Sequence, residues 1–390
     1  MAVQHGTTSS ARPDSWDHGG TAVPSPRSAG RARCELARLW RMSQPDFSAL
    51  GELTVVSPPR GGHHAAPSDV MYPGGATVDG GLLAPGDPIP ENAGPGGRRP
   101  EWLKVRIGAG ETYASVKRVM RGEALHTVCE EARCPNMGEC WSLGTATFMV
   151  LGSVCTRNCG FCAIDTGRPP VTDPDEPRRV AEATTQMGLR HVVITMVARD
   201  DLADGGAGIV AETIRQVRMA NPGTSIEVLI SDLNGREPDI RTVVEAQPEI
   251  LNHNVETVPR LQRAVRRRAR WDRSVGVLTT GRAIATGIGH HEMVTKTGIM
   301  LGLGEAWDEV VAAMALLRAA DVDVLTIGQY LRPSARHLPL IKYYTPAEFA
   351  ALRRIGFEMG FRHVQSGPLV RSSYHAAEQV PGRDAAAAAS

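Results

Sequence analysis

Six of the chain's seven cysteines fall into two groups of three, separated by a short β-prone run. The first group has the spacing C-x4-C-x5-C and the second the spacing C-x3-C-x2-C. Thiolates grouped in this way bind soft metals, so the pattern predicts two neighbouring metal centres. The candidate ligands are Cys129, Cys134 and Cys140 in the first triplet and Cys155, Cys159 and Cys162 in the second.

The spacing favours iron–sulfur clusters over zinc. Structural zinc sites are closed by four ligands, which usually come as C-x2-C pairs. Neither triplet offers two such pairs, and each is one ligand short of a closed site. A four-iron cluster takes one thiolate per iron, so three cysteines leave one iron open, as in a catalytic centre. A zinc-stabilised binding module or a simple electron carrier is the non-catalytic alternative.

Polar residues also follow several predicted strands. The run at 199–201 (RDD) comes after the apolar segment 191–195, the run at 252–254 (NHN) ends the segment 250–253, and Gln329-Tyr330 follows the segment 322–327. The second triplet follows the segment 145–151 in the same way. Barrels of parallel strands carry their catalytic groups on the loops after the strands' carboxyl ends. The repetition therefore predicts an active site at that edge.

Short apolar runs alternate with amphipathic segments from residue 145 onward, which predicts a parallel sheet with helices outside. About six strand–helix units favour an α/β fold of the partial (β/α)6-type TIM barrel over an open doubly wound sheet. Strands are expected at 145–151, 191–195, 225–230, 250–253, 297–301, 322–327 and 361–365. Helices are expected at 176–187, 206–219, 239–246, 258–268, 307–320 and 346–360, with a further one at 271–278.

Composition divides the chain into four parts. Residues 1–100 hold 13 of the 27 prolines and many glycine pairs, so 1–99 are expected to be a disordered, low-complexity extension that includes the lone Cys34. Residues 100–144 form an N-terminal cluster-binding segment. Residues 145–377 form the barrel with a C-terminal R-S-S-Y segment, and 378–390 a disordered tail.

Charge and hydropathy exclude several partners. The net charge of +1 predicts no nucleic-acid binding and no electrostatic membrane attachment, and no apolar run reaches 18 residues. The N-terminus lacks the apolar core of a secretory signal, so the thiols are expected to work in the reducing cytoplasm. The mitochondrial matrix is the alternative if Arg27, Arg31 and Arg33 belong to a transit peptide, although Asp14 and Asp17 argue against one.

The second triplet, with Phe161 directly before its last cysteine, resembles the cluster motif of the radical S-adenosylmethionine superfamily. In that superfamily the open iron binds the amino and carboxylate groups of S-adenosylmethionine. One-electron reduction then yields methionine and a 5′-deoxyadenosyl radical. The resemblance implies that Cys155, Cys159 and Cys162 are catalytic ligands and that Phe161 lies at the cofactor.

Further motifs between about Pro100 and Ala377 resemble the lipoyl synthase family. They are VCEEARCPNMGEC, RDDLADGGA, NHNVETVPR, GQYLRPS and GPLVRSSYHA. That family inserts sulfur at C6 and C8 of an octanoyl chain on a carrier-domain lysine and consumes a second cluster as the sulfur source. The resemblance implies two [4Fe-4S] clusters, two S-adenosylmethionine molecules per lipoyl group, and an auxiliary cluster on Cys129, Cys134 and Cys140.

The resemblance also supplies a fourth ligand and the partners. The serine before the tyrosine in R-S-S-Y maps to Ser373, which is expected to bind the fourth iron of the auxiliary cluster. A hard alkoxide is a weak ligand for a soft cluster, which suits a cluster that must be dismantled. The implied partners are octanoylated carrier domains of 2-oxoacid dehydrogenase E2 subunits, the glycine-cleavage carrier protein, a flavodoxin or ferredoxin, and an iron–sulfur carrier.

Further cofactor contacts follow from the same resemblance, each with a simpler alternative. Asp200, Asp201, Gly205 and Gly206 lie where the superfamily binds the methionine part of its cofactor, but they also fit a helix cap with turn glycines. The remaining candidates lie at strand ends. They are expected to hydrogen-bond to the cofactor's ribose or to the substrate, and the alternative is that they only close the strands: Thr195, Asn252, Asn254 and Glu256.

Two stretches depart from the family pattern. VRRRAR at 265–270 replaces a usual V-R-P-G-A turn, and its arginines are expected to be a solvated helix end or an attractor for an acidic carrier domain. Residues 276–289 are rich in glycine and threonine, so the helix there is expected to be shortened or irregular.

Overall fold

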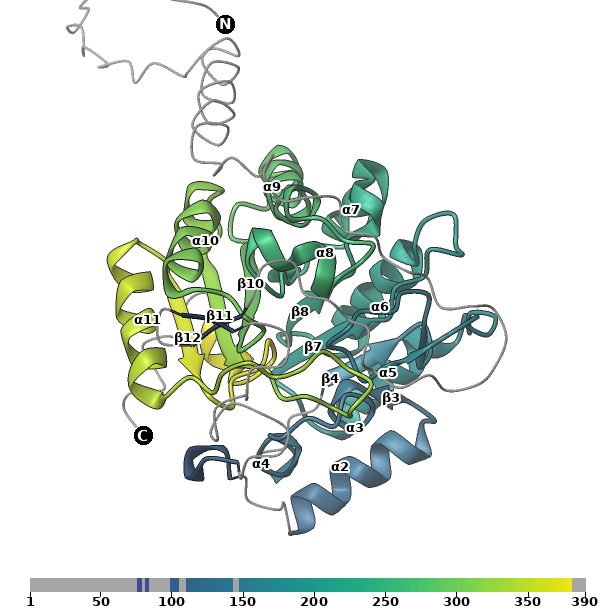
Figure 1. The fold of residues 1–390 in the computed structure, drawn as a ribbon. Coiled ribbons are helices and arrows are strands. Elements are labelled where there is room, and N and C mark those ends of the chain that lie inside the picture. Colours follow the sequence, from purple (N-terminus) through teal and green to yellow (C-terminus); the bar gives the residue numbers. More distant parts are fainter. Residues whose placement is uncertain (1–75, 79–80, 84–98, 105–109, 143–146, 381–390) are drawn as a thin grey trace, which may run out of the picture. The chain divides into compact units, whose positions relative to one another are not determined.

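The computed structural model describes residues 76–78, 81–83, 99–104, 110–142 and 147–380 (Figure 1). The chain divides into two units, 1–63 and 64–390, and all described residues belong to the second. Cys34, most of the extension at 1–99 and the tail from 381 therefore lie outside the described residues. Part of the extension is described as a short antiparallel pair, β1 (Ala76–Val78) and β2 (Gly81–Leu83).

A single eight-stranded sheet organises the described chain, in the order β12-β11-β10-β9-β8-β7-β4-β3. Neighbouring strands are parallel except β3 and β4, which are antiparallel. The end strands β12 and β3 do not pair with each other, so this part of the chain forms the predicted partial barrel. The strands are β3 (His126–Thr127), β4 (Thr147–Val150), β7 (His191–Met196), β8 (Ser225–Leu229), β9 (Ile250–Asn252), β10 (Val294–Leu301), β11 (Val324–Gln329) and β12 (His363–Gly367).

Helices cover the outer face of the sheet (Figure 1). Several begin where the sequence provides a start signal: α5, α7 and α11 carry proline in the first turn, and Thr345 and Glu348 form a capping box on α11. Their apolar faces join the buried strands in two large core clusters. The helices are α5 (Glu176–Gln186), α6 (Ala207–Ala220), α7 (Glu237–Glu245), α8 (Gln262–Val265), α9 (Trp271–Gly287), α10 (Trp307–Ala319) and α11 (Pro346–Glu358).

Two predictions about the connection between β9 and β10 are wrong. The helix expected at 258–268 is a 3-10 turn, η5 (Pro259–Leu261), followed by the single turn of α8. The stretch expected to be shortened or irregular at 276–289 is instead a continuous helix through Gly287. At the C-terminus the fold continues through η6 (Ala376–Gln379) to the buried Val380, past the expected boundary at 377.

The segment before the first parallel strand packs against the end of the sheet formed by β3 and β4. It contains η3 (Glu101–Leu103), α2 (Glu111–Gly122), α3 (Val128–Glu131) and α4 (Met137–Ser142). Trp141 is fully buried, and its ring contacts Tyr113 of α2 with centroids 5.1 Å apart. Burying an aromatic ring of this size fixes the short α4, which could not persist alone.

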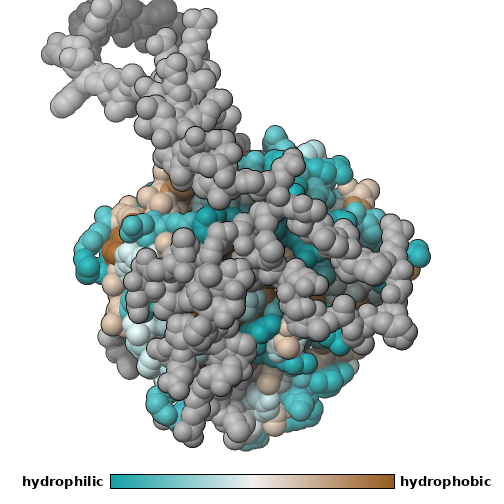
Figure 2. Space-filling model, in the orientation of Figure 1, coloured by the Kyte–Doolittle hydropathy of each residue, from teal (hydrophilic) through white to brown (hydrophobic). Residues whose placement is uncertain are grey.

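The described surface offers little apolar area. Its exposed large hydrophobic residues are scattered over separate elements: Trp102, Val171, Met219, Ile288 and Phe357. On the face shown in Figure 2, the coloured surface is mostly hydrophilic, with hydrophobic residues in small areas. None of the described helices has the length and apolarity needed to span a bilayer.

Candidate active site with two cysteine triplets

The first triplet spans α3, the turn that follows it and α4: Cys129 lies in α3, Cys134 in the turn and Cys140 in α4. Cys129 is buried in α3, and its backbone carbonyl accepts from the Cys134 amide at 2.9 Å. Burial, followed by repulsion from the neighbouring thiols, raises the pKa of Cys134 to about 11 and that of Cys140 to about 12. The structure therefore brings the three thiols together, and a bound cation would be needed to hold Cys134 and Cys140 as thiolates.

The C-terminal R-S-S-Y segment reaches this triplet from the other end of the chain. Asn136 Nδ2 donates to the Leu369 carbonyl at 2.7 Å. Burial raises the pKa of Cys134, and the charge of nearby Arg371 partly opposes this rise. The Tyr374 hydroxyl donates to Glu139 at 3.1 Å. Ser373 lies between Arg371 and Tyr374, and its hydroxyl makes no hydrogen bond to the described residues.

The second triplet occupies a loop held by a small parallel pair, β5 (Val154–Cys155) and β6 (Asp165–Thr166). The Arg157 amide donates to Cys155 Sγ at 3.4 Å, and the Cys162 amide donates to the Cys159 carbonyl at 3.1 Å. Burial is the main reason that the pKa of Cys159 is raised to about 11 and that of Cys162 to about 12.

Distant segments hold this loop in place. The Gly160 amide donates to the Val265 carbonyl at 3.0 Å, and the Gly160 carbonyl accepts from the Leu338 amide at 2.8 Å. The pair His337 Nε2 and Cys162 carbonyl adds a 2.9 Å hydrogen bond, and half-buried Phe161 packs on the second core cluster. The segment after β11 that contains His337 and Leu338 therefore packs against the cysteine loop.

The arrangement fits clusters better than single ions. Within the described chain, no three His, Cys, Asp or Glu side chains are placed to share one metal ion. A four-iron cluster puts a separate iron at each thiolate, so it spreads its ligands further apart than a single zinc ion does. Each triplet offers three buried or half-buried thiols with no histidine among them, which matches the soft donor set of such a cluster.

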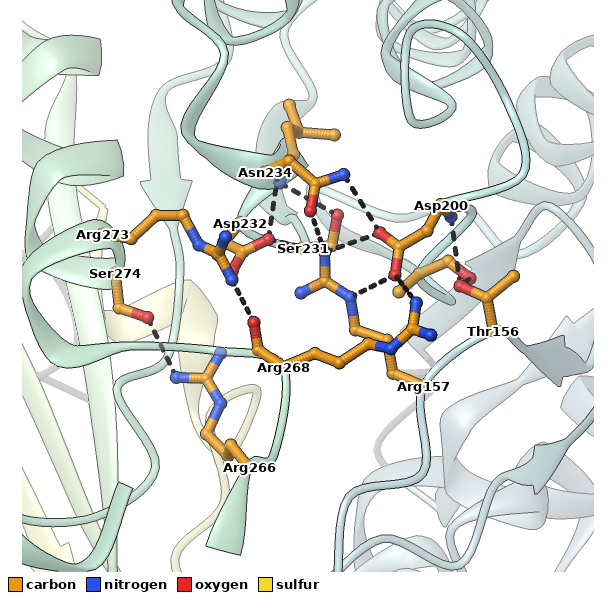
Figure 3. A network of polar contacts seen from close by, with 12 residues as sticks. Thr156, Arg157, Asp200, Ser231, Asp232, Asn234, Arg266, Arg268, Arg273 and Ser274 are labelled. Atoms are coloured by element: carbon orange, nitrogen blue, oxygen red, sulfur yellow. Dashed lines mark hydrogen bonds and ion pairs between the residues drawn. The ribbon is translucent and has the colours of Figure 1, made fainter. Parts of the chain in front are cut away.

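Arg157, inside the second triplet, is the centre of a charge network (Figure 3). Its guanidinium donates to both Asp200 oxygens at 2.8 and 2.7 Å and forms an ion pair with Asp232 at 2.7 Å. Asn234 bridges Arg157 and Asp200, while Arg273 forms an ion pair with Asp232 at 2.8 Å. Hydrogen bonds from Arg157 hold the pKa of Asp200 below its ordinary value. Burial alone would raise the pKa of Asp232, but Arg157 keeps it lowered.

The loop after β7 is held by a second arginine. Arg199 donates to both Asp201 oxygens at 2.9 and 2.8 Å and to the carbonyl of Leu151, which follows β4. Gly206 has a φ of 92°, and a Cβ there would lie 2.3 Å from Leu151 Cδ1. Both aspartates of the predicted cofactor site thus bind arginines, whereas Gly205 and Gly206 form the tight turn into α6.

The predicted residues at β7 and β9 separate into two surroundings. Thr195 Oγ1 donates to the Leu229 carbonyl, and Asn252 donates to Glu227, which pairs with the fully buried Lys296 inside the barrel. Beyond β9, Asn254 Nδ2 donates to Ser372 Oγ at 2.6 Å. The Oδ1 atoms of Asn252 and Asn254 are buried without a hydrogen-bond partner in the described chain, as in a site built for a polar ligand.

Glu256 and Arg266 face the second triplet from the β9 side. Burial raises the pKa of Glu256. Burial also raises the pKa of Cys159, and the charge of Arg266 opposes this rise whereas that of Glu256 adds to it. Arg266 donates to the Asn254 carbonyl at 3.0 Å and is buried, so its expected place on a solvated helix end is wrong. The sequence signals missed were the position of Arg157 inside the cysteine motif and that of Asp232 after a predicted strand.

Known proteins with the same sequence features identify the family. The family model described as the radical SAM superfamily matches residues 149–317, and the N-terminal domain of lipoyl synthase matches residues 89–134. The lipoyl synthase of Rubrobacter xylanophilus is 57% identical over 282 residues, which cover 72% of this chain and 86% of that protein. The lipoyl synthase of Bacillus mycoides is 57% identical over 284 residues, covering 73% of this chain and 94% of that protein. The chain belongs to the lipoyl synthase family of radical S-adenosylmethionine enzymes.

Proposed function

We propose that this chain converts octanoyl-lysine on a carrier domain into lipoyl-lysine by inserting sulfur at C6 and C8. One observation carries the proposal: residues 369–375 contact Asn136 and Glu139, on the segment that carries the first triplet, while Ser372 of the same segment bonds to Asn254 beside the second triplet's site. One short segment therefore links both thiol centres, as a reaction that uses a radical source and a sulfur source together requires.

The two triplets have different roles in this proposal. Cys155, Cys159 and Cys162 hold the cluster that binds S-adenosylmethionine. When bound, that cluster supplies the electron that cleaves the sulfonium. Cys129, Cys134 and Cys140 hold the auxiliary cluster, and Ser373 provides its fourth ligand. The flanking contacts of Arg371 and Tyr374 with the first triplet support this assignment of Ser373.

The remaining site residues either position the loops of the site or bind the cofactor or substrate. Arg157 fixes the cysteine loop by joining it to Asp200 and Asp232 after two other strands. Asp201 holds its own loop through Arg199, so that the backbone at Gly205 and Gly206 is presented at the edge. Thr195, Asn252, Asn254 and Glu256 line the strand ends. The Oδ1 atoms of Asn252 and Asn254 have no hydrogen-bond partner among the described residues and can accept hydrogen bonds from cofactor or substrate.

Lipoyl domains are the substrates of the family, and we extend this to the carriers of 2-oxoacid dehydrogenases and glycine cleavage. A flavodoxin or ferredoxin supplies electrons, and an iron–sulfur carrier renews the auxiliary cluster. The bacterial relatives support a cytoplasmic location.

Anaerobic reconstitution tests the proposal directly. Two four-iron clusters predict about eight irons per chain. The reduced protein, given S-adenosylmethionine and an octanoyl-lysyl peptide, is expected to add the mass of two sulfur atoms to the peptide. Stoichiometric zinc without iron would overturn the cluster assignment. Production of 5′-deoxyadenosine without sulfur insertion would indicate a radical enzyme with a different acceptor.

Substitution of one cysteine in each triplet tests the division of roles. Cys155→Ala is expected to abolish 5′-deoxyadenosine formation, because it removes a ligand of the cluster that binds the cofactor. Cys134→Ala is expected to abolish sulfur insertion while some cleavage persists. Chromatography of 5′-deoxyadenosine and mass spectrometry of the peptide measure the two outcomes. Equal loss of cleavage in both variants would contradict the assignment.

A further inference from the structure

The segment 260–273 (RLQRAVRRRARWDR) carries seven arginines and one acidic residue, in a chain whose 43 basic and 42 acidic residues nearly balance. This charge is therefore a local feature. It begins after β9 and ends in the first turn of α9. Part of it replaces the turn usual in the family, so it belongs to this chain's own variation.

The arginine segment (residues 263–270) lies directly against the loop of the second triplet. The Val265 carbonyl accepts from Gly160, between Cys159 and Cys162, and Arg266 is buried facing Cys159. Arg268 forms an ion pair with Asp200, the partner of Arg157, at 3.5 Å. Figure 3 shows the Arg268 side chain beside this carboxylate. Three residues of chain span at most roughly 11 Å, so the segment's exposed side chains start close to the rim of this centre.

Much of the segment's charge faces solvent. Arg263 and Arg267 are exposed and form no ion pair with the described residues. The Arg268 side chain is 67% exposed, and that of Arg270 is 70% exposed beside the equally open Asp272. Asp200 and Asp272 offset the charges of Arg268 and Arg270, whereas Arg263 and Arg267 have no acidic partner among the described residues. The segment therefore presents net positive charge to an approaching partner.

We propose that the arginine segment docks the acidic one-electron carrier protein, of the flavodoxin type, that reduces the cluster on Cys155, Cys159 and Cys162. The proposal rests on the proposed function, which creates the need for that electron. Docking passes one electron from the reduced flavin to the cluster, oxidising the flavin and reducing the cluster by one electron each. No atom other than an accompanying flavin proton changes place.

The contacts favour this partner over the octanoylated carrier domain. A carrier domain must deliver its acyl chain to both centres. In the described chain, residues 263–270 contact the second triplet's loop and the network around Arg157. Residues 369–375 instead contact Asn136 and Glu139, on the segment that carries the first triplet. An electron donor needs only the second centre. Complementary charge at such a rim chiefly raises the association rate and makes it sensitive to salt.

Charge reversal tests the proposal on the cluster-loaded protein. Arg267→Glu/Arg270→Glu is expected to slow association with flavodoxin by roughly 10-fold or more at low salt and to flatten the salt dependence. Binding of oxidised flavodoxin, followed by its absorbance change and by surface plasmon resonance, measures this without turnover. Sulfur insertion driven by dithionite should stay within about twofold of wild type, because neither side chain contacts the centre.

Lys117→Glu/Arg118→Glu, on the exposed face of α2, is the matched control and should bind flavodoxin as wild type does. Unchanged flavodoxin binding by the arginine variant would overturn the proposal. So would a raised KM for the octanoylated carrier domain in the dithionite assay, which would assign the segment to that domain. Absence of sulfur insertion in wild type with dithionite would instead refute the proposed function and leave the binding result to stand by itself.

Discussion

Ser372 and Ser373 are adjacent, but their hydroxyl groups have different surroundings. Ser372 accepts a hydrogen bond from Asn254 at the end of β9. Ser373 lies between Arg371, which faces Cys134, and Tyr374, which bonds to Glu139 near Cys140. The Ser372 hydroxyl is therefore held beside Asn254, while the neighbours of Ser373 contact the segment of the first triplet.

This difference predicts separate effects of two alanine substitutions. Ser373→Ala is expected to reduce sulfur insertion roughly 10- to 100-fold, because it removes the ligand that we propose for the auxiliary cluster, while formation of 5′-deoxyadenosine continues. Ser372→Ala removes one hydrogen bond, worth about 1 kcal/mol, and should change cofactor affinity by less than about tenfold. Mass spectrometry of the peptide and chromatography of the nucleoside measure both. Loss of insertion in Ser372→Ala with a normal Ser373→Ala would reverse the assignment.

At the scale of residues, spacing predicted which cysteines group together, because each triplet lies within one short segment. Resemblance supplied Ser373, more than 230 residues from Cys140, which no local pattern could connect to it. The partners of Arg157 escaped prediction for the same reason. Asp200 and Asp232 approach it only when β7 and β8 pair beside β4, so the contact depends on the sheet.

At the scale of elements, α9 shows how a glycine-rich helix can be required by packing. Its buried positions recur at helical spacing: Val277, Leu278, Gly281, Ile284 and Ala285. A Cβ on Gly281 would lie 2.2 Å from Leu251 Cδ2, so the helix approaches β9 closely at this residue. A Cβ on Gly276 would meet nothing within 4 Å. Gly281 thus leaves no room for a side chain, whereas Gly276 in the same helix does.

We therefore predict opposite signs for two glycine-to-alanine changes in α9. Gly281→Ala should lower the free energy of unfolding by about 1–3 kcal/mol, because the added methyl group overpacks the buried contact with Leu251. Gly276→Ala should raise it by about 0.5–1 kcal/mol, since alanine costs less backbone entropy in a helix. Anaerobic denaturant unfolding measures both. Equal effects would show that Gly281 is not a close-packing position.

The bounds of the strands could be predicted from the sequence where the apolar run was continuous. The run at 191–195 matched β7, but β10 begins at Val294, three residues before its expected start. Lys296 interrupts the apolar pattern there, and it is buried only because Glu227 lies 2.9 Å away on β8. In α9 the low helix propensity of Thr279, Thr280 and Gly281 concealed a helix that tertiary packing maintains.

At the scale of the whole molecule, one buried imidazole connects the barrel to the helix layer. His253 Nδ1 lies 2.8 Å from the Ile230 carbonyl, which can only accept, so this nitrogen carries the proton. Its Nε2 then accepts from Ser274 Oγ, which itself accepts from Arg266. Burial, followed by the charge of Arg266, lowers the pKa of His253 to about 4, while Asp232 acts in the opposite direction.

This pKa predicts how the stability of the folded protein depends on pH. Between about pH 4 and the ordinary histidine pKa of 6.5, His253 binds a proton in the unfolded chain but stays neutral in the folded protein. Stability should therefore fall as the pH falls through this window, by roughly 3 kcal/mol in all. His253→Gln should remove this part of the slope, whereas His290→Gln, in the turn after α9, should keep it. Anaerobic unfolding at several pH values measures the slope of the unfolding free energy against pH for wild type and both variants. Loss of the clusters in acid is common to the three proteins, so it cancels when their slopes are compared. An unchanged slope in His253→Gln would mean that the neutral imidazole contributes nothing to acid sensitivity.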